Sequence, residues 1–475
     1  MNATTGDTPL APTSPNKAGL LINRDFALLW LGQGVSYLGD FVFDTTLVVW
    51  IATQLAVGQS WAPLAVSGVL VAATLPIFLV GPFAGVFVDR WDKRRTMLAM
   101  DVARAALIAL LLLAAGIVPL PFLPGGQLSL PQRLAAIYAI VFLAAACAQF
   151  FTPARTALLG DIVEAELQPR AASLSQVTFA LATIVGPPLA APLLFAFGVQ
   201  WALIINAVSF LASFLAIRAI HPPRQTESTE RAPHAGFLRE WVQGVRFYFG
   251  NHVLTALLVA AVIAIFGAGA LNALGVFFVT QNLRAAPTIY GVFDSVYAVG
   301  ALLGAVLGGV FAQRIGLTRL VWLSLLLLGV CILVYSRLTS VPPALAVLFV
   351  AGIPQATLNI AIGPLVLRVT PRELLGRVMA VLNPMITGAS LASIAIAGYL
   401  ASTALHGFHA RVAGLELGPL DTIFGVAGLL VVVGALYAAI ALRAAGGEAA
   451  AQSLPIAVAG AAAMPTLADA EAAPR

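Results

Sequence analysis

Two aspartates lie inside the first long apolar run of the sequence, at 26–53, where a charged side chain can do chemistry. Asp40 lies 14 residues beyond Phe26, about 21 Å along a helix, so a membrane-spanning helix would hold it near the middle of the bilayer. Asp44 follows at i+4 on the same helix face, and repulsion between the two carboxylates favours proton binding by at least one of them. The pattern predicts proton coupling at Asp40, with Asp44 as the second candidate. The alternative is that both are solvated in an aqueous vestibule.

Three further charged residues lie in apolar runs. Asp101 and Arg104 are spaced i, i+3, so we expect them to pair, and either a structural or a gating role is open to that pair. Asp294 lies near the outer end of its run, and an interfacial position is expected for it.

Four amide side chains also interrupt apolar runs, and each is expected to form a hydrogen bond between helices. Together they indicate a cavity that is mostly apolar with few polar groups, suited to small amphipathic substrate molecules. These candidate cavity residues are Gln149, Asn272, Gln355 and Asn359.

No pattern in the sequence indicates catalysis, a metal ion or a cofactor. There is no P-loop for a nucleotide, and the five histidines show no zinc-binding spacing. Cys147 and Cys331 lie in apolar runs and fit neither a disulfide framework nor a metal site. An intramembrane enzyme would need a His/Asp or Ser/His cluster facing the membrane surface, and the sequence has none. We therefore expect no catalytic residues.

The composition identifies the class of protein. Of 475 residues, 60% are hydrophobic and 9% are charged, and the mean hydropathy is +0.96. Soluble domains carry about 25% charged residues, so a water-soluble enzyme of this composition would have a largely apolar surface. The sequence therefore predicts an all-α integral membrane protein that contacts the lipid bilayer. The net charge of +5 is a signal of membrane topology, and no nucleic-acid partner is expected.

Apolar runs bounded by charges, Gly or Pro predict twelve transmembrane helices in two sets of six. The predicted spans are 26–53, 63–88, 97–119, 132–152, 172–197, 199–219, 251–279, 288–313, 318–337, 342–366, 375–400 and 421–443.

The arrangement of spans predicts five segments. Residues 1–25 form an N-terminal tail, 26–219 a first six-helix bundle, and 251–443 a second one. Between them, 220–250 is a polar linker that ends in either an amphipathic helix on the membrane surface or an extension of span seven. The Ala- and Gly-rich tail 444–475 is expected to be disordered.

Lysine and arginine are distributed unequally between the two sides of the predicted spans. Twenty of the 25 lie on the side of the N-terminus and four on the other side, with Arg104 inside a span. The positive-inside rule then predicts that both termini are cytoplasmic.

The two halves contain related segments, which suggests a parallel repeat. Gly85-Val-Phe-Val-Asp89-Arg90 ends span two, and Gly309-Val-Phe-Ala-Gln313-Arg314 ends span eight. The first segment, continued by Lys93 and Arg94, resembles motif A of the major facilitator superfamily. The segment from Asn23 through Asp40, and Thr152-Pro153-Ala154-Arg155 with Gly160-Asp161, are similar to the bacterial drug-exporter branch that includes macrolide and enterobactin exporters.

This resemblance implies the major facilitator fold and a gate. In such a gate, Asp89 engages the start of span eleven near Arg377 and locks the outward-open state, and the other motif residues belong to the same turn. The implied gating set is Gly85, Asp89, Arg90, Lys93, Arg94 and Arg377.

The expected function is secondary active transport. We expect a monomer in the bacterial inner membrane that exports small amphipathic compounds, drug-like, macrolide-like or siderophore-like, in exchange for protons by alternating access. The alternatives are an uncoupled uniporter and a transporter-like receptor. No cofactor is expected.

Overall fold

The computed structural model describes residues 22–116, 128–221, 237–412 and 415–461, and most of them are helical. Within these ranges, twelve helical segments are long and apolar enough to cross a membrane. The predicted all-α membrane fold with twelve spans is therefore confirmed. Parts of the predicted N-terminal tail, linker and C-terminal tail lie outside the described residues.

The first bundle holds the first six spans, of which the second is divided between two helices. Its helices are α1 (Arg24–Trp50), α2 (Ala62–Leu79), α3 (Gly81–Val88), α4 (Lys93–Ala114), α5 (Leu130–Ile162), α6 (Gln168–Phe197) and α7 (Val199–Arg218).

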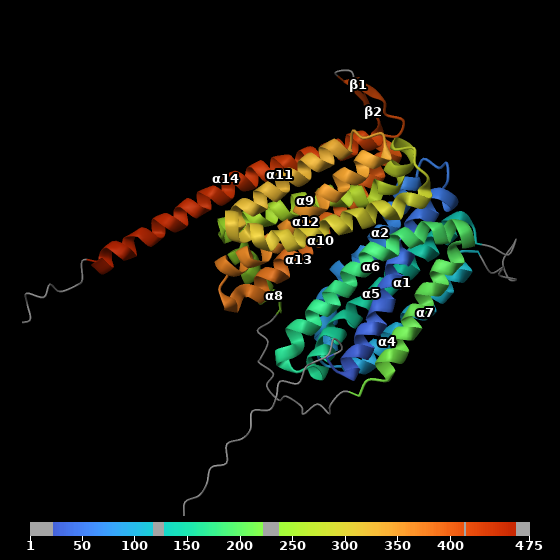
Figure 1. The fold of residues 1–475 in the computed structure, drawn as a ribbon, viewed down its shortest axis with the longest axis horizontal. Coiled ribbons are helices and arrows are strands. Elements are labelled where there is room, and N and C mark those ends of the chain that lie inside the picture. The colour runs from blue at the N-terminus through green and yellow to red at the C-terminus, as the bar shows by residue number, and fades with distance from the viewer. Residues whose placement is uncertain (1–21, 117–127, 222–236, 413–414, 462–475) are drawn as a thin grey trace, which may run out of the picture.

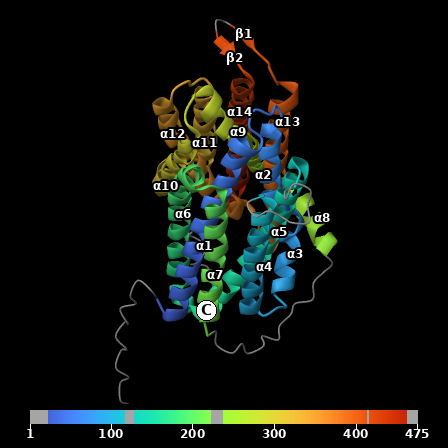
Figure 2. The same cartoon turned by 90° about the vertical axis from the view of Figure 1, so that its right-hand side faces the viewer.

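The second bundle holds the other six spans, and two elements outside them accompany it. Its helices are α8 (Phe237–Gly250), α9 (His252–Phe277), α10 (Tyr290–Ile315), α11 (Leu317–Tyr335), α12 (Val341–Val369), α13 (Leu375–Tyr399) and α14 (Pro419–Ala461). An antiparallel hairpin of β1 (Ala410–Val412) and β2 (Leu415–Leu417) pairs Ala410 with Leu417. In Figure 2 this hairpin projects beyond the ends of α13 and α14.

Proline marks the break in the second span. The helix α2 ends at Leu79, and Val80 donates a backbone hydrogen bond to the Pro76 carbonyl oxygen at 2.8 Å. Pro82 then lies in the first turn of α3, where its missing N–H has no helical partner to lose. The single span predicted at 63–88 is therefore two helices joined at Val80.

The fourth span is longer than predicted because it continues through Pro153. We expected a loop after residue 152, but α5 runs on to Ile162 and contains Arg155 and Asp161. Ala154, Leu158 and Ile162 are buried along one face of this extension. Packing of that face stabilises the helix where a proline would otherwise end it.

The tail that was expected to be disordered begins at residue 444, and α14 extends into it as far as Ala461. There the chain continues α14 without a break, and it is rich in alanine, the strongest helix former. Figure 1 shows this extension of α14 leaving the bundle.

The linker ends in a helix that is separate from span seven. Asn251 follows α8, and its side-chain oxygen accepts hydrogen bonds from the backbone N–H groups of Val253 and Leu254 at 3.0 and 3.1 Å. Because this N-cap begins α9, α8 is not an extension of that helix. The buried Tyr248 and the half-buried Val245 and Phe247 pack α8 into the core of the second bundle.

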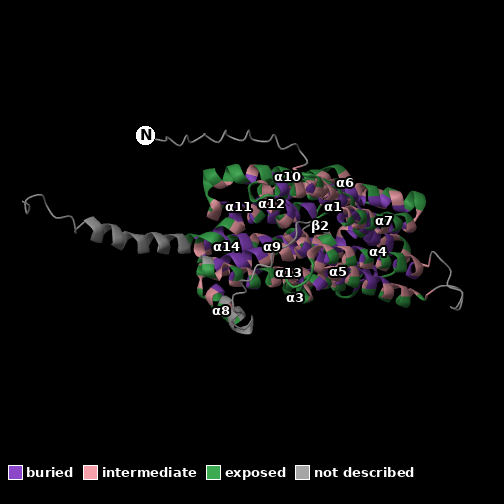
Figure 3. Ribbon diagram, turned by 90° about the horizontal axis from the view of Figure 1, so that it is seen from below, coloured by how far each residue is buried: buried purple, intermediate pink, exposed green. Residues whose placement is uncertain are grey.

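Small residues allow the helices of the first bundle to approach closely. A Cβ atom at Gly39 of α1 would lie 2.9 Å from the Cβ of Ser209 in α7, and one at Gly32 would lie 3.0 Å from the Cβ of Ala216. In membranes, helices associate through such close backbone contacts at small residues, because lipid is as apolar as large hydrophobic side chains. Figure 3 shows buried residues between the helices and exposed ones on the outside of both bundles.

The two bundles contact each other in the half of the molecule that carries the hairpin. There the Ser295 hydroxyl of α10 donates to the Ile184 carbonyl oxygen of α6 at 2.6 Å, and the Leu64 N–H of α2 donates to the Ser402 hydroxyl at 2.9 Å. Gly398 of α13 lies directly against Ser67 of α2. Toward the end that carries α8 the bundles diverge (Figure 1).

A cap on α4 provides a test of local stability. The Asp92 carboxylate accepts a hydrogen bond from the Arg95 N–H at 2.7 Å. Asp92→Ala is expected to lower the free energy of unfolding by about 1 kcal/mol, because an N-cap interaction is lost. Denaturation of the purified protein in detergent measures the change. Asp92→Asn preserves the cap and should leave the free energy within about 0.5 kcal/mol of the wild type; equal losses in both variants would contradict the assignment.

Candidate functional site

A cavity of about 560 Å³ lies between the two bundles. The first bundle contributes α1, α2 and α6 to its walls, and the second contributes α9 and α10. On α10, one helix face supplies Asp294, Ala298, Ala301 and Ala305, whose small side chains leave the space open. The lining is mostly apolar, as is typical of sites for small organic molecules.

One carboxylate from each bundle lines this cavity. Asp44 of α1 is exposed, although it lies well inside a membrane-spanning helix, and its exposed surface faces the cavity. Asp294 of α10 is half-buried and faces the same space from the other bundle. Asp294 lies one turn from the start of α10 at Tyr290, near the span end where it was expected, and its side chain lines the cavity.

The hollow continues along α1 toward that helix's N-terminus. Gln176 and Phe179 line both the central cavity and a second one of about 510 Å³, which reaches Phe26. Arg155 of α5 lines this second cavity, donates a hydrogen bond to the Tyr37 hydroxyl and covers that ring. A cation therefore lies between the central cavity and the α8 end.

A smaller cavity of about 100 Å³ lies within the second bundle and adjoins the central one. Asn272, Tyr290, Asp294 and Tyr297 line both. Gln355 lines the smaller cavity, and its Oε1 atom is buried without a hydrogen-bond partner among the described residues.

Asp101 and Arg104 form the ion pair expected from their spacing. An Arg104 Nη atom lies 2.5 Å from the Asp101 carboxylate, and both side chains are buried, at 0% and 6% relative exposure. The rings of Phe151 and Phe210 lie 4.5 and 4.3 Å from the guanidinium carbon. These rings exclude water from the pair and stabilise the cation through their π faces.

Asp40 lies beside this ion pair. It is half-buried between α1, α4 and α7, next to the side-chain amide of Asn206, and both Arg104 and Asp101 act on it electrostatically. The α1–α7 seam at Gly39 brings Asp40 to this position.

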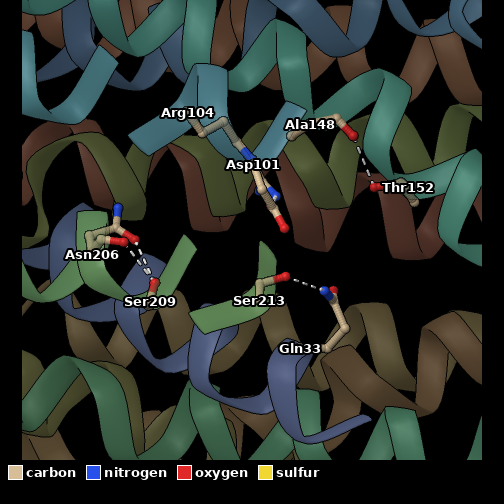
Figure 4. A network of polar contacts seen from close by, with 8 residues as sticks. All are labelled: Gln33, Asp101, Arg104, Ala148, Thr152, Asn206, Ser209 and Ser213. Carbon is tan, nitrogen blue, oxygen red and sulfur yellow. Dashed lines mark hydrogen bonds and ion pairs between the residues drawn. The ribbon is translucent and has the colours of Figure 1, made fainter. Parts of the chain in front are cut away.

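Hydroxyl and amide groups lie around Asp101 and Arg104 (Figure 4). The Gln33 amide donates to the Ser213 hydroxyl at 3.3 Å, and the Ser209 hydroxyl donates to the Asn206 backbone oxygen at 2.8 Å. Of the two aspartates of α1, Asp44 lines the central cavity. Asp40 is not among the lining residues and lies in the interior of the first bundle.

The motif-A turn divides into two groups of residues. Lys93 pairs with Asp161 of α5 at 2.9 Å. The Arg94 Nε atom donates to the Ile217 carbonyl oxygen at 3.1 Å, near the end of α7. Lys93 and Arg94 therefore join α4 to its neighbours within the first bundle.

The other members of the gating set take no part in these contacts within the first bundle. Asp89 and Arg90 are exposed, and a Cβ atom at Gly85 would meet open space. Arg377, at the start of α13, donates a hydrogen bond to the side chain of Gln243 in α8 at 3.0 Å. In this structure Asp89 has no side-chain partner among the described residues, and it is not joined to Arg377.

The predicted cavity amides lie in different places. Asn272 lines the central cavity and Gln355 the smaller one. Gln149 donates to the Ala145 carbonyl oxygen of its own helix at 3.3 Å, and its side-chain oxygen lies near Gly81 of α3. Asn359 is exposed on α12.

Sequence reasoning missed the parts of the site that depend on contacts between helices. Asp294 was assigned to a span end and Arg155 to the loop after residue 152, and Gln176, Tyr290 and Tyr297 were not singled out. A signal was available for Asp294, because the small residues 298, 301 and 305 follow it on one helix face. Within the described residues, no group of three or more His, Cys, Asp or Glu side chains could hold a metal ion.

Comparison with known proteins agrees with this architecture. Residues 16–417 match the family described as transmembrane secretion effector. The MFS-type transporter YkuC of Bacillus subtilis (strain 168) is 25% identical over 394 residues, which cover 80% of this chain and 86% of YkuC. Macrolide efflux protein A of Streptococcus pyogenes is 22% identical over 305 residues, covering 64% and 71%. The resemblance to the drug-exporter branch is thereby confirmed.

Solved structures show the same fold. A bacterial homologue of the iron transporter ferroportin in an inward-facing state superposes with a TM-score of 0.64 at 15% identity, covering 89% of this chain and 98% of that one. Two bundles of six helices around a central cavity, and a match over most of the length, identify the chain as a transporter of the transmembrane secretion effector family in the major facilitator superfamily.

Proposed function

We propose that this protein is a proton-coupled exporter of small amphipathic compounds that works by alternating access. The observation that carries the proposal is the cavity between the bundles, mostly apolar and lined by a carboxylate from each side. Two properties of a substrate follow from it: a size that a cavity of about 560 Å³ holds, and an apolar body with few polar groups. The efflux function named for the relative from Streptococcus pyogenes supports the direction of transport.

In this proposal the protein is a monomer in the bacterial inner membrane with both termini in the cytoplasm. The excess of Lys and Arg at the α8 end supports that orientation. The hollow from the central cavity toward Phe26 then opens to the cytoplasm, and the contacts of α10 with α6 and of α13 with α2 close the outer side. This conformation is inward-open.

The gate of the proposal is made by the motif-A turn and α13. When the cytoplasmic ends of the bundles approach, Asp89 engages the N-terminal end of α13 near Arg377, where a carboxylate is stabilised by the helix dipole. In the inward-open state Arg377 contacts Gln243 of α8 instead. The exchange of one partner for the other accompanies the change of state, with Gly85, Arg90, Lys93 and Arg94 shaping the turn.

Asp40 carries the proton in this proposal. With both carboxylates ionised, Asp40, Asp101 and Arg104 together carry one net negative charge, and one proton neutralises the cluster. Because a net charge is costly to hold inside the membrane, the cluster takes up a proton when water leaves it and releases one when water returns. Asp44, one turn closer to the outer side, is the second candidate for this role.

Transport into inverted membrane vesicles tests the function and the role of Asp40 together. Wild-type protein should accumulate amphipathic compounds from a panel of drugs and siderophores only when a proton gradient is present. Asp40→Asn preserves size and removes the charge, so the variant should still exchange substrate down a gradient but lose uphill accumulation and substrate-induced proton release.

The outcomes separate the alternatives. Asp44→Asn should retain part of the uphill transport, and a loss in that variant alone would move the proton site to Asp44. Gradient-driven transport that survives in Asp40→Asn removes this residue from the mechanism. Wild-type transport that never exceeds equilibration identifies an uncoupled uniporter, and binding without any transport identifies a receptor.

Neutralising the gate residue should favour the inward-open state. Asp89→Asn removes a charge from an exposed side chain and no core volume, so the protein should fold and insert while transport falls about tenfold. Ser175 lines the second cavity, which opens to the cytoplasm in this proposal. A cysteine at that position should be labelled faster from the cytoplasmic side in this variant. Asp92→Asn makes the same charge change in the same turn and should alter neither property; equal effects of both would show that charge alone is responsible.

A crosslink across the outer contact tests alternating access. Cβ atoms at Ser67 and Gly398 would lie 2.5 Å apart, so a shift of about 1 Å gives the separation of a disulfide. Oxidation of the Ser67→Cys/Gly398→Cys protein should stop transport, and reduction should restore it. Each single variant controls for the substitution itself, and full transport by the oxidised double variant would argue that the outer contact need not open.

A further inference from the structure

We infer that the central cavity binds an organic ammonium cation between Asp44 of the first bundle and Asp294 of the second. This inference rests on the proposed function and names its substrate class: an amphipathic molecule with a protonated amine on an apolar, preferably aromatic, body.

The charge of the cavity is unbalanced. Asp44 and Asp294 line it from opposite bundles, and neither has a hydrogen bond or ion pair among the described residues. Among the described residues, those that line the cavity include no lysine or arginine. A carboxylate in a mostly apolar space inside a membrane is unfavourable unless a cation or a proton accompanies it. A positively charged ligand balances these groups in place of the protons that they otherwise take up.

An independent observation indicates that this cation donates hydrogen bonds. Gln355 lines the small cavity that Asp294, Tyr290 and Tyr297 share with the central one, and its Oε1 atom is buried without a hydrogen-bond partner among the described residues. A buried acceptor without a donor is unfavourable. Carboxylates and an amide oxygen are all acceptors, so an ammonium group, with up to three N–H donors, matches them better than a quaternary cation that has none.

Aromatic side chains surround the same space and suit the rest of the ligand. Phe41 and Phe179 lie on the first bundle, and their ring centroids are 5.5 Å apart in an edge-to-face arrangement. Tyr290 and Tyr297 belong to α10 on the second bundle. Their faces attract organic cations and cover an apolar body.

The second cavity gives the ligand an orientation. Arg155 and Tyr37 lie there, and Tyr37 precedes Asp44 by seven residues, about 10 Å along α1. An ammonium group is repelled by Arg155 and attracted to the acidic end, so it lies near the closed outer side with the apolar body toward the cytoplasmic opening.

The proposed binding site lies next to the contact between α10 and α6 that closes the outer side. Asp294 is adjacent to Ser295, whose hydroxyl donates to the Ile184 carbonyl oxygen of α6 at 2.6 Å, and Gly291 lies against Pro187 of the same helix. A cation held by Asp44 and Asp294 therefore contacts both bundles beside the contact that must open for release to the outside.

Equilibrium binding to the purified full-length protein in detergent tests the inference with a matched pair of fluorescent probes. The first is 1-pyrenylmethylammonium, and the second is 1-pyrenemethanol, which has the same aromatic body and no charge. The wild type should bind the ammonium at least tenfold more tightly. Asp294→Asn and Asp44→Asn should each lower its affinity by about 10- to 100-fold, the range for a hydrogen bond to a charged group, and leave alcohol binding within about twofold.

Alcohol binding shows whether each variant is folded, so loss of structure cannot imitate the expected result. Glu166→Gln, an exposed carboxylate outside the cavities, is the matched charge control and should bind both probes as the wild type does. The inference is overturned if the wild type binds the two probes equally or binds neither, or if the preference for the ammonium survives in Asp294→Asn. Because no gradient is used, this failure is distinct from an absence of uphill transport, which would instead refute the proposed function.

Discussion

Charge inside a membrane is the constraint on which the rest of this structure depends. A carboxylate in a transmembrane helix needs a cation, a proton or water, and the acids described above meet the requirement in three ways. Asp101 has Arg104 at 2.5 Å, and two phenylalanine rings cover the pair. Asp40 lies near that pair, but Arg104 forms its ion pair with Asp101. Asp44 and Asp294 face a cavity. Asp101 is therefore part of a structural ion pair, and Asp40 is the proton site of the proposed mechanism. Asp44 and Asp294 are the two carboxylates that face the proposed ligand.

Close helix packing makes this division possible. Gly39 allows α1 to approach α7 at Ser209, and the neighbouring Asp40 is thereby turned toward Arg104. Asp44, one helical turn further, is exposed to the cavity. On the opposite bundle, Gly291 and Ser295 bring α10 against α6, and Asp294 lies between them in sequence. The same small residues that build each interface also determine which side chains face the hollow, so packing and site geometry are one property of these helices.

In the proposed mechanism, one short segment, the motif-A turn, serves both stability and motion. Asp92 caps α4, Lys93 pairs with Asp161, and Arg94 holds the end of α7, so these residues fix the turn to the first bundle. Asp89 stays exposed on that rigid support. A gate needs one partner that is held in place and one contact that can be exchanged, and in the proposed mechanism that contact is the one between Arg377 and Gln243 of α8.

The sequence by itself determined the membrane class, the twelve spans, the division into two halves and the pairing of Asp101 with Arg104, because hydropathy and helical spacing are local properties. One error lay where contacts distant in sequence outweigh a local rule, because α5 continues through Pro153 with one face of its extension buried. Another was a local signal that was missed, because span two divides at Val80 beside Pro76 and Pro82. Only the tertiary structure decided that Asp294 faces the cavity with Asp44 and that Gln149 lies against α3. A helix pattern gives the face on which a residue lies, but which neighbour covers that face depends on the packing of helices far apart in the chain.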